Sequence, residues 1–308
     1  EWNVGEFDFD TGAWIKDDAE GVKWVTKLGS QTYGNPVVAG GRVFIGTNND
    51  GGYSKRYPKD VDLGVLLCLS EKDGSFLWQH SNEKLKTGNQ HDWPHVGVCS
   101  SPMVAGDRLW YVTNRCEVVC LDTQGFHDGE DDGVKDSTSN DKREADVVWR
   151  FDMMDRLGVS PHNMSNCSVT VVGDLVYVCT SNGTDEEDHV VAPDAPSFIA
   201  LHKDTGKLVW EADAKHGPGG NILHGQWSSP AFGVFADTPQ VIFAGGDGWL
   251  YAFHATEHDN GSAKLLWKCD LNRKDVEWDD TGSGERNNII ATPVIADGHV
   301  FIATGQDP

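Results

Sequence analysis

The sequence predicts an all-β protein, built as a β-propeller of four-stranded antiparallel blades. A tryptophan closes a short apolar strand at five places, Trp24, Trp78, Trp149, Trp210 and Trp267. The spacing varies from 54 to 71 residues, which indicates one structural unit repeated with insertions in its loops. Short strands bounded by Gly and Asp turns, with no helical periodicity, predict β structure throughout. Four antiparallel strands in a repeat of this length are typical of a propeller blade.

Each unit has the same order of elements. An apolar strand A is expected first, at 35–39, 101–105, 168–172, 229–232 and 292–296. A Gly or Asp turn then leads to a β-branched and aromatic strand B, at 43–45, 109–112, 176–178, 241–243 and 300–302. Strand C is expected at 66–69, 118–122, 198–201 and 250–253, and strand D ends at the tryptophan. The complete units therefore span residues 36–78, 102–149, 169–210 and 230–267, and a partial unit begins at residue 293.

Composition limits the classes of partner. The chain has 308 residues, enough for one domain with a large core. Its formal charge of −23 argues against nucleic acid, which requires a basic surface, and favours cationic partners or metal ions. No run approaches the ~18 apolar residues of a membrane-spanning helix. No signal peptide is visible, and the chain starts without Met, as a processed or a trimmed chain does.

Seven cysteines raise the question of disulfides or metal binding. Cys68 and Cys120 occupy the strand C position that Ala200 and Ala252 fill in other units, so we expect them to be buried thiols. A bridge between Cys116 and Cys120 stays open as an alternative. The absence of a Cys-x-x-Cys-His motif excludes covalently attached c-type haem.

The turns and third strands resemble a known repeat. The segments 204–210 and 246–253 resemble the signature turn and third strand of the pyrroloquinoline-quinone-type (PQQ-like) β-propeller repeat. The strings at 162–168 and 224–228 are similar to those of uncharacterised extracytoplasmic bacterial propellers. The resemblance implies that residues 1–308 form one PQQ-like propeller domain in a periplasmic or secreted protein.

Two ring sizes are consistent with the repeat count. In one, Val22–Lys27 pairs with the blade that begins at Pro293 and closes a ring of five blades. In the other, the chain is part of a ring of seven or eight blades. Relatives of the repeat usually carry more than five blades, which favours the larger ring.

Equivalent loops before strand A predict a candidate site. Counting back seven residues from the strand A position reaches histidines in two loops, a residue beside His224 in the next, and an arginine in the last. These loops approach the propeller axis, and the long insertions 49–62 and 183–196 share their face and could cover it. The candidate ligand-binding residues are His95, His162, Asn163, Asn182, His224, Gln226, Trp227, Arg286 and Asn287. The alternatives are structural polar groups at a channel mouth and a metal site of three histidines.

The resemblance also allows a comparison with quinoprotein dehydrogenases. Asn182 stands where those enzymes have a calcium-binding Asn. The next loop has Gly225 and Ser228 where their string carries acids, one of them the catalytic Asp, and the adjacent Cys pair that covers the quinone is absent. PQQ is therefore disfavoured as a cofactor, because this chemistry needs a carboxylate base beside a metal-polarised quinone.

An acidic loop at 126–146 is expected on the opposite face. Oxygen-bearing side chains alternate before Gly133, as at the start of a calcium loop, in the candidate set Asp128, Glu130, Asp132 and Asp136. Ser139 stands where such a loop has its final Glu, so a solvated acidic loop is the competing interpretation.

Two functions follow from these patterns. The first is an extracytoplasmic binding or assembly module without quinoprotein catalysis, whose partner is a protein or a small polar ligand. The second is a quinoprotein-like oxidoreductase that uses a quinone or a metal at the histidine-rich mouth. The missing catalytic acid favours the first.

Overall fold

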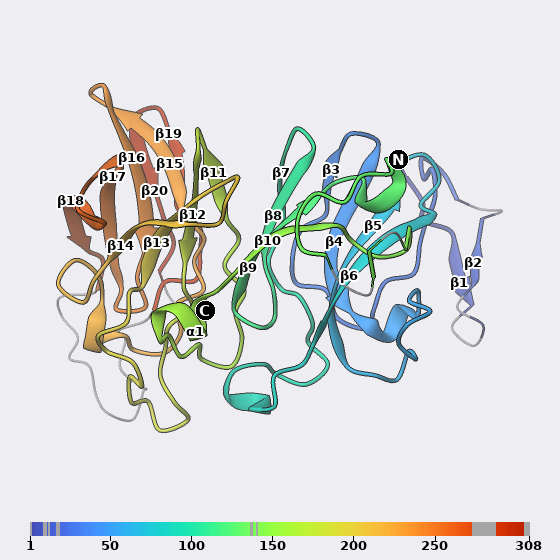
Figure 1. Cartoon of the computed structure of the whole chain (residues 1–308), viewed down its shortest axis with the longest axis horizontal. Coiled ribbons are helices and arrows are strands. Elements are labelled where there is room, and N and C mark those ends of the chain that lie inside the picture. The colour runs from blue at the N-terminus through green and yellow to red at the C-terminus, as the bar shows by residue number, and fades with distance from the viewer. Residues whose placement is uncertain are drawn as a thin grey trace.

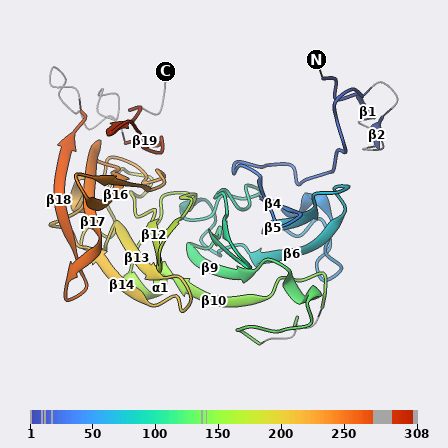
Figure 2. The same ribbon diagram turned by 90° about the horizontal axis from the view of Figure 1, so that it is seen from above.

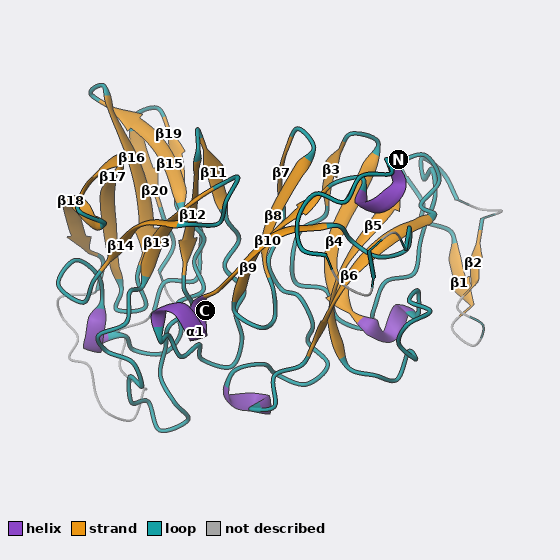
Figure 3. Ribbon diagram, viewed as in Figure 1, coloured by secondary structure: helices purple, strands orange, loops and turns teal. Residues whose placement is uncertain are grey.

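The computed structural model describes residues 2–8, 11, 13–16, 19–135, 138–139, 141–272 and 288–304. Nearly all regular structure in this part of the chain is β, as Figure 3 shows. One short α-helix, α1 (Met153–Leu157), is described beside single 3₁₀ turns. The predicted all-β class is confirmed.

Four complete blades of antiparallel strands are present. The first has β3 (Val37–Ala39), β4 (Arg42–Asn48), β5 (Leu63–Ser70) and β6 (Phe76–Glu83). The second has β7 (Met103–Ala105), β8 (Arg108–Val112), β9 (Glu117–Asp122) and β10 (Val147–Asp152). The third has β11 (Thr170–Val172), β12 (Leu175–Cys179), β13 (Phe198–His202) and β14 (Leu208–Ala212). The fourth has β15 (Ala231–Phe235), β16 (Thr238–Ala244), β17 (Trp249–Asp259) and β18 (Ser262–Asp270).

Two hairpins flank these blades. The hairpin β1 (Glu6–Asp8) and β2 (Ala13–Ile15) precedes the first blade, and β19 (Val294–Ala296) pairs with β20 (His299–Phe301) after the fourth. The blades stand side by side in an arc that is open between the two hairpins (Figures 1 and 2). Residues 22–27 belong to no strand, and within the described residues β19 and β20 pair only with each other. The pairing that a five-bladed ring requires is therefore not formed.

The recurrent tryptophan lies opposite a small residue in every complete blade. Trp78 pairs with Cys68, Trp149 with Cys120, Trp210 with Ala200 and Trp267 with Ala252. The register of strands C and D shifts next to each of these pairs. A small residue leaves room for the indole ring, which explains why only cysteine or alanine stands at this position in the four blades.

The same tryptophan also joins one blade to the next. The indole Nε1 of Trp149 donates to the carbonyl of Lys203 at 2.8 Å, and Trp24 donates to Glu71 at 2.9 Å. A Cβ built on Gly206 would lie 2.5 Å from the ring of Trp149. The glycine of each such turn therefore lets the tryptophan of the preceding unit lie flat against it. The repeated Gly and Trp of the sequence are two halves of one contact between blades.

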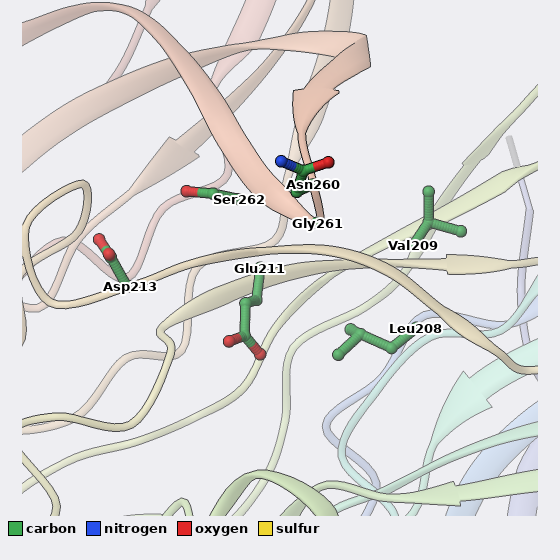
Figure 4. A pocket seen from close by; sticks show the side chains of 7 residues that line it. All are labelled: Leu208, Val209, Glu211, Asp213, Asn260, Gly261 and Ser262. Carbon is green, nitrogen blue, oxygen red and sulfur yellow. The ribbon is translucent and has the colours of Figure 1, made fainter.

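The third and fourth blades have an additional backbone connection. The long β17–β18 hairpin turns at Asn260 and Gly261, and the amide of Glu211 in β14 donates to the carbonyl of Gly261 at 2.9 Å. The two blades thereby form one eight-stranded sheet. Between them lies a groove of about 340 Å³, lined by Glu211 and Asp213 on one side and by the hairpin turn on the other (Figure 4). The hairpin covers the outer edge strand, which would otherwise present free backbone groups.

The cysteines are free thiols. Six of the seven are buried, and Cys269 is exposed. Burial raises the pKa of the Cys116 thiol to about 12, so this thiol is protonated at neutral pH. The bridge between Cys116 and Cys120 that the sequence left open is not formed.

The loops separate onto two faces. The insertions 49–62 and 183–196, together with 84–97 and 213–227, lie at the lower side of Figure 1 and are called the loop face here. The acidic segment 126–135 lies on the opposite side. Among the described residues, no helix is long and apolar enough to span a bilayer.

Candidate functional site on the loop face

His162 lies in the loop before β11 and is buried, with 3% of its surface exposed. Its Nδ1 is 2.8 Å from the carbonyl oxygen of Thr184, to which it donates, and its Nε2 accepts from the Asn163 side chain at 2.9 Å. Gly183 permits this approach, since an added Cβ would lie 2.6 Å from the His162 Cβ. Both ring nitrogens are therefore used: Nδ1 holds the 183–196 loop against the propeller, and Nε2 binds the neighbouring side chain of its own loop.

His224 and Trp227 complete an aromatic cluster around His162. The ring centroids of His162 and His224 are 4.0 Å apart, and Trp227 lies 5.9 Å from His162 and 5.4 Å from His224. Burial, and next the proximity of His162, lowers the pKa of His224. The Nδ1 of His224 lies 3.8 Å from a carboxylate oxygen of Asp188. At neutral pH the His224 imidazole is therefore neutral beside the Asp188 carboxylate.

Trp227 is oriented by its own loop and by the loop before β11. Its indole Nε1 donates to the carbonyl of Met164 at 3.3 Å. A Cβ on Gly225 would lie 2.4 Å from the Trp227 ring, so no larger residue fits at position 225 in this arrangement. Trp227 therefore packs between two loops.

The structure does not bring His95 to this cluster. The His95 side chain is 68% exposed, and its Nδ1 lies 3.9 Å from Asp62. Its backbone amide also donates to Asp62, at 2.8 Å, and its carbonyl accepts from Asn48. Of the predicted set, Arg286 and Asn287 lie outside the described residues.

Asn163 links two neighbouring loops. Its backbone amide donates to Gln90 and its carbonyl accepts from Trp93, each at 3.0 Å. Its backbone φ is +58°, in the left-handed region that Asn tolerates. Its side-chain oxygen is buried without a hydrogen-bond partner. The backbone hydrogen bonds thus hold Asn163 in place, and its side-chain oxygen remains an unused acceptor.

The side chains of Asn182 and Gln226 are fully buried, and both make hydrogen bonds to neighbouring loops. The Asn182 side-chain oxygen accepts from the amide of Ser160 at 2.9 Å, and its nitrogen donates to Ala192 at 2.9 Å. Gln226 donates to the carbonyl of Asn182 and to the Ser197 hydroxyl, each at 2.9 Å. These amides satisfy backbone groups of loops that would otherwise be buried without partners.

The residues present do not fit calcium and a quinone in the manner of a quinoprotein dehydrogenase. The Asn182 oxygen that would ligate calcium is occupied by a backbone amide. The Trp227 ring leaves no room for an acid at position 225. In the described part of the chain, no group of three or more His, Cys, Asp or Glu side chains is arranged to hold a metal ion.

The acidic loop is organised around Arg108. The guanidinium contacts Asp122 at 2.5 Å and Asp132 at 2.8 Å. Asp128 accepts from the amide of Glu130 at 2.9 Å, so this part of the loop is a local turn. Asp136 lies outside the described residues. Arg108 thus pairs with one of the four candidate calcium ligands, Asp132.

Some functional groups were not apparent in the sequence. Asp188 and Thr184 come next to the histidines only because the 183–196 loop folds back, and no spacing in the sequence signals that. Asp92 was expected at the same mouth, but its partners were not: it is buried, contacts Lys84, and accepts from Asn114 at 2.8 Å. Its partners are 8 and 22 residues away along the chain, outside any short motif.

One family model and several solved structures are similar to this chain. A family model described as outer membrane protein assembly factor BamB matches residues 10–130 and 63–307. No curated protein sequence matches the chain. BamB from Moraxella catarrhalis is similar in structure, with 14% identity and a TM-score of 0.47, over 91% of this chain and 57% of that one.

Two solved oxidoreductases are similar to the same degree. A europium-containing methanol dehydrogenase matches with 13% identity and a TM-score of 0.49, over 90% of this chain and 48% of that one. The quinohemoprotein alcohol dehydrogenase ADHIIG from Pseudomonas putida matches with 13% identity and a TM-score of 0.48, over 92% and 40%. The chain thus spans about half the length of these proteins. By its match to the family model over nearly its whole length, the chain belongs to the PQQ-like β-propeller family described as outer membrane protein assembly factor BamB.

Proposed function

We propose that this chain is an extracytoplasmic binding and assembly module, which contacts a protein partner through its loop face and carries out no quinoprotein catalysis. The observation that carries the proposal is the engagement of Asn182 and Gln226. Both side chains are fully buried and use their hydrogen bonds to hold neighbouring loops together, not to line an open site for calcium or a quinone. The family description, an assembly factor of outer membrane proteins, supports the same role and the same compartment.

The loop face has features of a protein interface. Trp93 is 43% exposed and lies beside the exposed His95. Exposed tryptophans are enriched among the residues that dominate binding energy at interfaces. The backbone of Trp93 is held by Asn163 at 3.0 Å, so the indole is presented from an ordered loop. A pre-ordered contact residue loses little conformational entropy on binding.

Site-specific photocrosslinking in cells that express the native protein tests this proposal. A photoreactive residue at position 93 is expected to give one dominant crosslinked protein in the extracytoplasmic fraction. The same residue at exposed Val134, on the opposite face, is the matched control and is expected to give none. Equal crosslinking from both positions, or recovery of the protein in the cytoplasm, would contradict the proposal.

One observation favours the second candidate, an oxidoreductase with a quinone or metal at the histidine-rich mouth. His162 and His224 lie with ring centroids 4.0 Å apart beside Trp227, and an aromatic face can stack on a planar ligand. A bound chromophore or a stoichiometric metal in the purified protein would favour this candidate. An absorbance spectrum combined with elemental analysis detects both.

A further inference from the structure

A pocket of about 530 Å³ opens on the loop face, between the 183–196 loop and the segment that leads to His224. Its walls include Val190, Pro193, Ile222 and Leu223, which are apolar, and the carboxylate of Asp188. Apolar walls with a few placed polar groups are typical of ligand pockets. The sequence placed Leu223 and the 183–196 insertion at this mouth, but none of the lining residues is in the candidate ligand-binding set.

The charge around the pocket is negative. Four consecutive acidic residues, 185–188, form the tip of the loop. The imidazole nearest to Asp188 belongs to His224, at 3.8 Å, and its lowered pKa keeps it neutral at neutral pH. His189 lies 3.7 Å from Asp185 and 3.8 Å from Glu187, so it is shared between two other carboxylates. Within the described residues, Asp188 is therefore paired with a neutral imidazole at this pH, and no charged basic side chain pairs with it there.

The tip that carries Asp188 is pre-ordered. The Asp185 side chain accepts from the amides of Glu187 and His189, each at 2.9 Å. At its base, the amide of Thr184 donates to the carbonyl of His224 at 3.0 Å, and its carbonyl accepts from His162. A ligand that meets Asp188 here does not have to order the loop first.

We propose that this pocket binds a lysine or arginine side chain of the partner protein. The aliphatic stem of such a side chain covers apolar surface while its charged end stays at the rim, which matches the apolar walls and the Asp188 carboxylate. Charge complementarity favours a basic side chain over an acidic or neutral one. The inference rests on the proposed function and specifies the chemistry of the partner residue.

The test is an NMR titration of methyl-labelled protein with short capped peptides. Peptides of one sequence carry lysine, arginine, norleucine or acetyl-lysine at the central position. The methyl signals of Val190, Ile222 and Leu223 are expected to shift with the lysine and arginine peptides. Binding of the norleucine and acetyl-lysine peptides is expected to be about three- to fivefold weaker, as for the loss of one partly exposed ion pair.

Asp188→Asn provides the variant. Asn keeps the left-handed backbone of position 188, whose φ is +61°, and removes only the charge. It is expected to weaken lysine-peptide binding by about three- to fivefold. Asp194→Asn, in the same loop but outside the pocket lining, is the matched control and leaves the affinity unchanged.

Two results would overturn the inference. One is equal binding of the lysine and norleucine peptides, and the other is an affinity that Asp188→Asn leaves unchanged while the methyl spectrum shows a folded protein. Neither result alters the crosslinking from position 93. Failure of the pocket is thus distinguishable from failure of the proposed function.

Discussion

His162 is a buried imidazole whose role is decided by its partners. It donates to the Thr184 carbonyl and accepts from Asn163, so both nitrogens hold backbone and side chain in place. His224, only partly buried, has a ring nitrogen facing Asp188 instead. Two histidines in equivalent loops therefore differ in function, because one is enclosed by the 183–196 loop and the other lies at its rim.

Replacement of His162 tests this structural role. His162→Ala removes the donor to the buried Thr184 carbonyl and is expected to lower the free energy of unfolding by about 1–3 kcal/mol. His95→Ala, at an exposed side chain, is expected to change it by less than about 0.5 kcal/mol. Urea unfolding followed by tryptophan fluorescence measures both. Equal changes in the free energy of unfolding for the two variants would show that the His162 side chain does not stabilise the fold.

Asp247 predicts a pH dependence of stability. It is 7% exposed and accepts from the Tyr251 hydroxyl at 2.5 Å, and burial raises its pKa from 3.8 to about 6. A raised carboxyl pKa contributes stability that is fully present below pH 3.8 and is lost as the pH rises through about 6. Relative to the wild type, Asp247→Asn should therefore gain on the order of 3 kcal/mol between pH 4 and pH 7.

Chemical denaturation of wild type and Asp247→Asn across that pH range gives this difference directly. The variant keeps an oxygen that can accept from Tyr251, so the hydroxyl is not left unpaired. A difference between the two proteins that stays constant from pH 4 to pH 7 would mean that Asp247 titrates at its ordinary pKa.

The blade is the element whose sequence pattern is most informative. Its strands are short and half or fully buried, so period-two patterns and turn residues locate them from local sequence alone. The sequence predicted the order of strands in all four complete blades and the small residue at the strand C position. It did not show that this residue faces the tryptophan, as Cys68 faces Trp78, because that pairing depends on a register shift between two strands.

The contact between Gly206 and Trp149 tests how blades are joined. Gly206→Ala places a Cβ 2.5 Å from the ring and adds the cost of a side chain at a φ of +65°. Gly173 has a similar φ of +59°, but a Cβ there meets nothing within 4 Å. Gly173→Ala is therefore expected to cost about 1 kcal/mol and Gly206→Ala about 1–3 kcal/mol more. Similar melting temperatures for the two variants would contradict a close contact between these blades.

Loops were predicted less well than strands. Counting from strand A placed His95 and His162 at equivalent positions, but the left-handed residue is His95 in one loop and Asn163 in the other. The two loops are thus offset by one residue, and the side chains point differently. Such offsets follow from hydrogen bonds to distant segments, such as His95 to Asp62, which no local pattern encodes.

At the scale of the whole molecule, the fold leaves the choice between binding and catalysis to its loops. The four blades provide a rigid arc, and the loop face carries the exposed Trp93, the His162–His224–Trp227 cluster and the Asp188 pocket. Asn182 and Gln226, which stand in the segments that resemble a quinone site, serve the packing of those loops. In this chain, the side chains at positions 182 and 226 therefore stabilise the packing of the loops.

The most direct test of this account is reconstitution with PQQ and calcium. The purified protein is incubated with both, passed through a desalting column, and examined by absorbance and by alcohol-dependent dye reduction. We expect the quinone to elute free of the protein and the dye to stay oxidised, because the Asn182 oxygen is occupied and position 225 has no room for an acid. Calcium-dependent retention of a stoichiometric amount of quinone, together with dye reduction, would contradict the account.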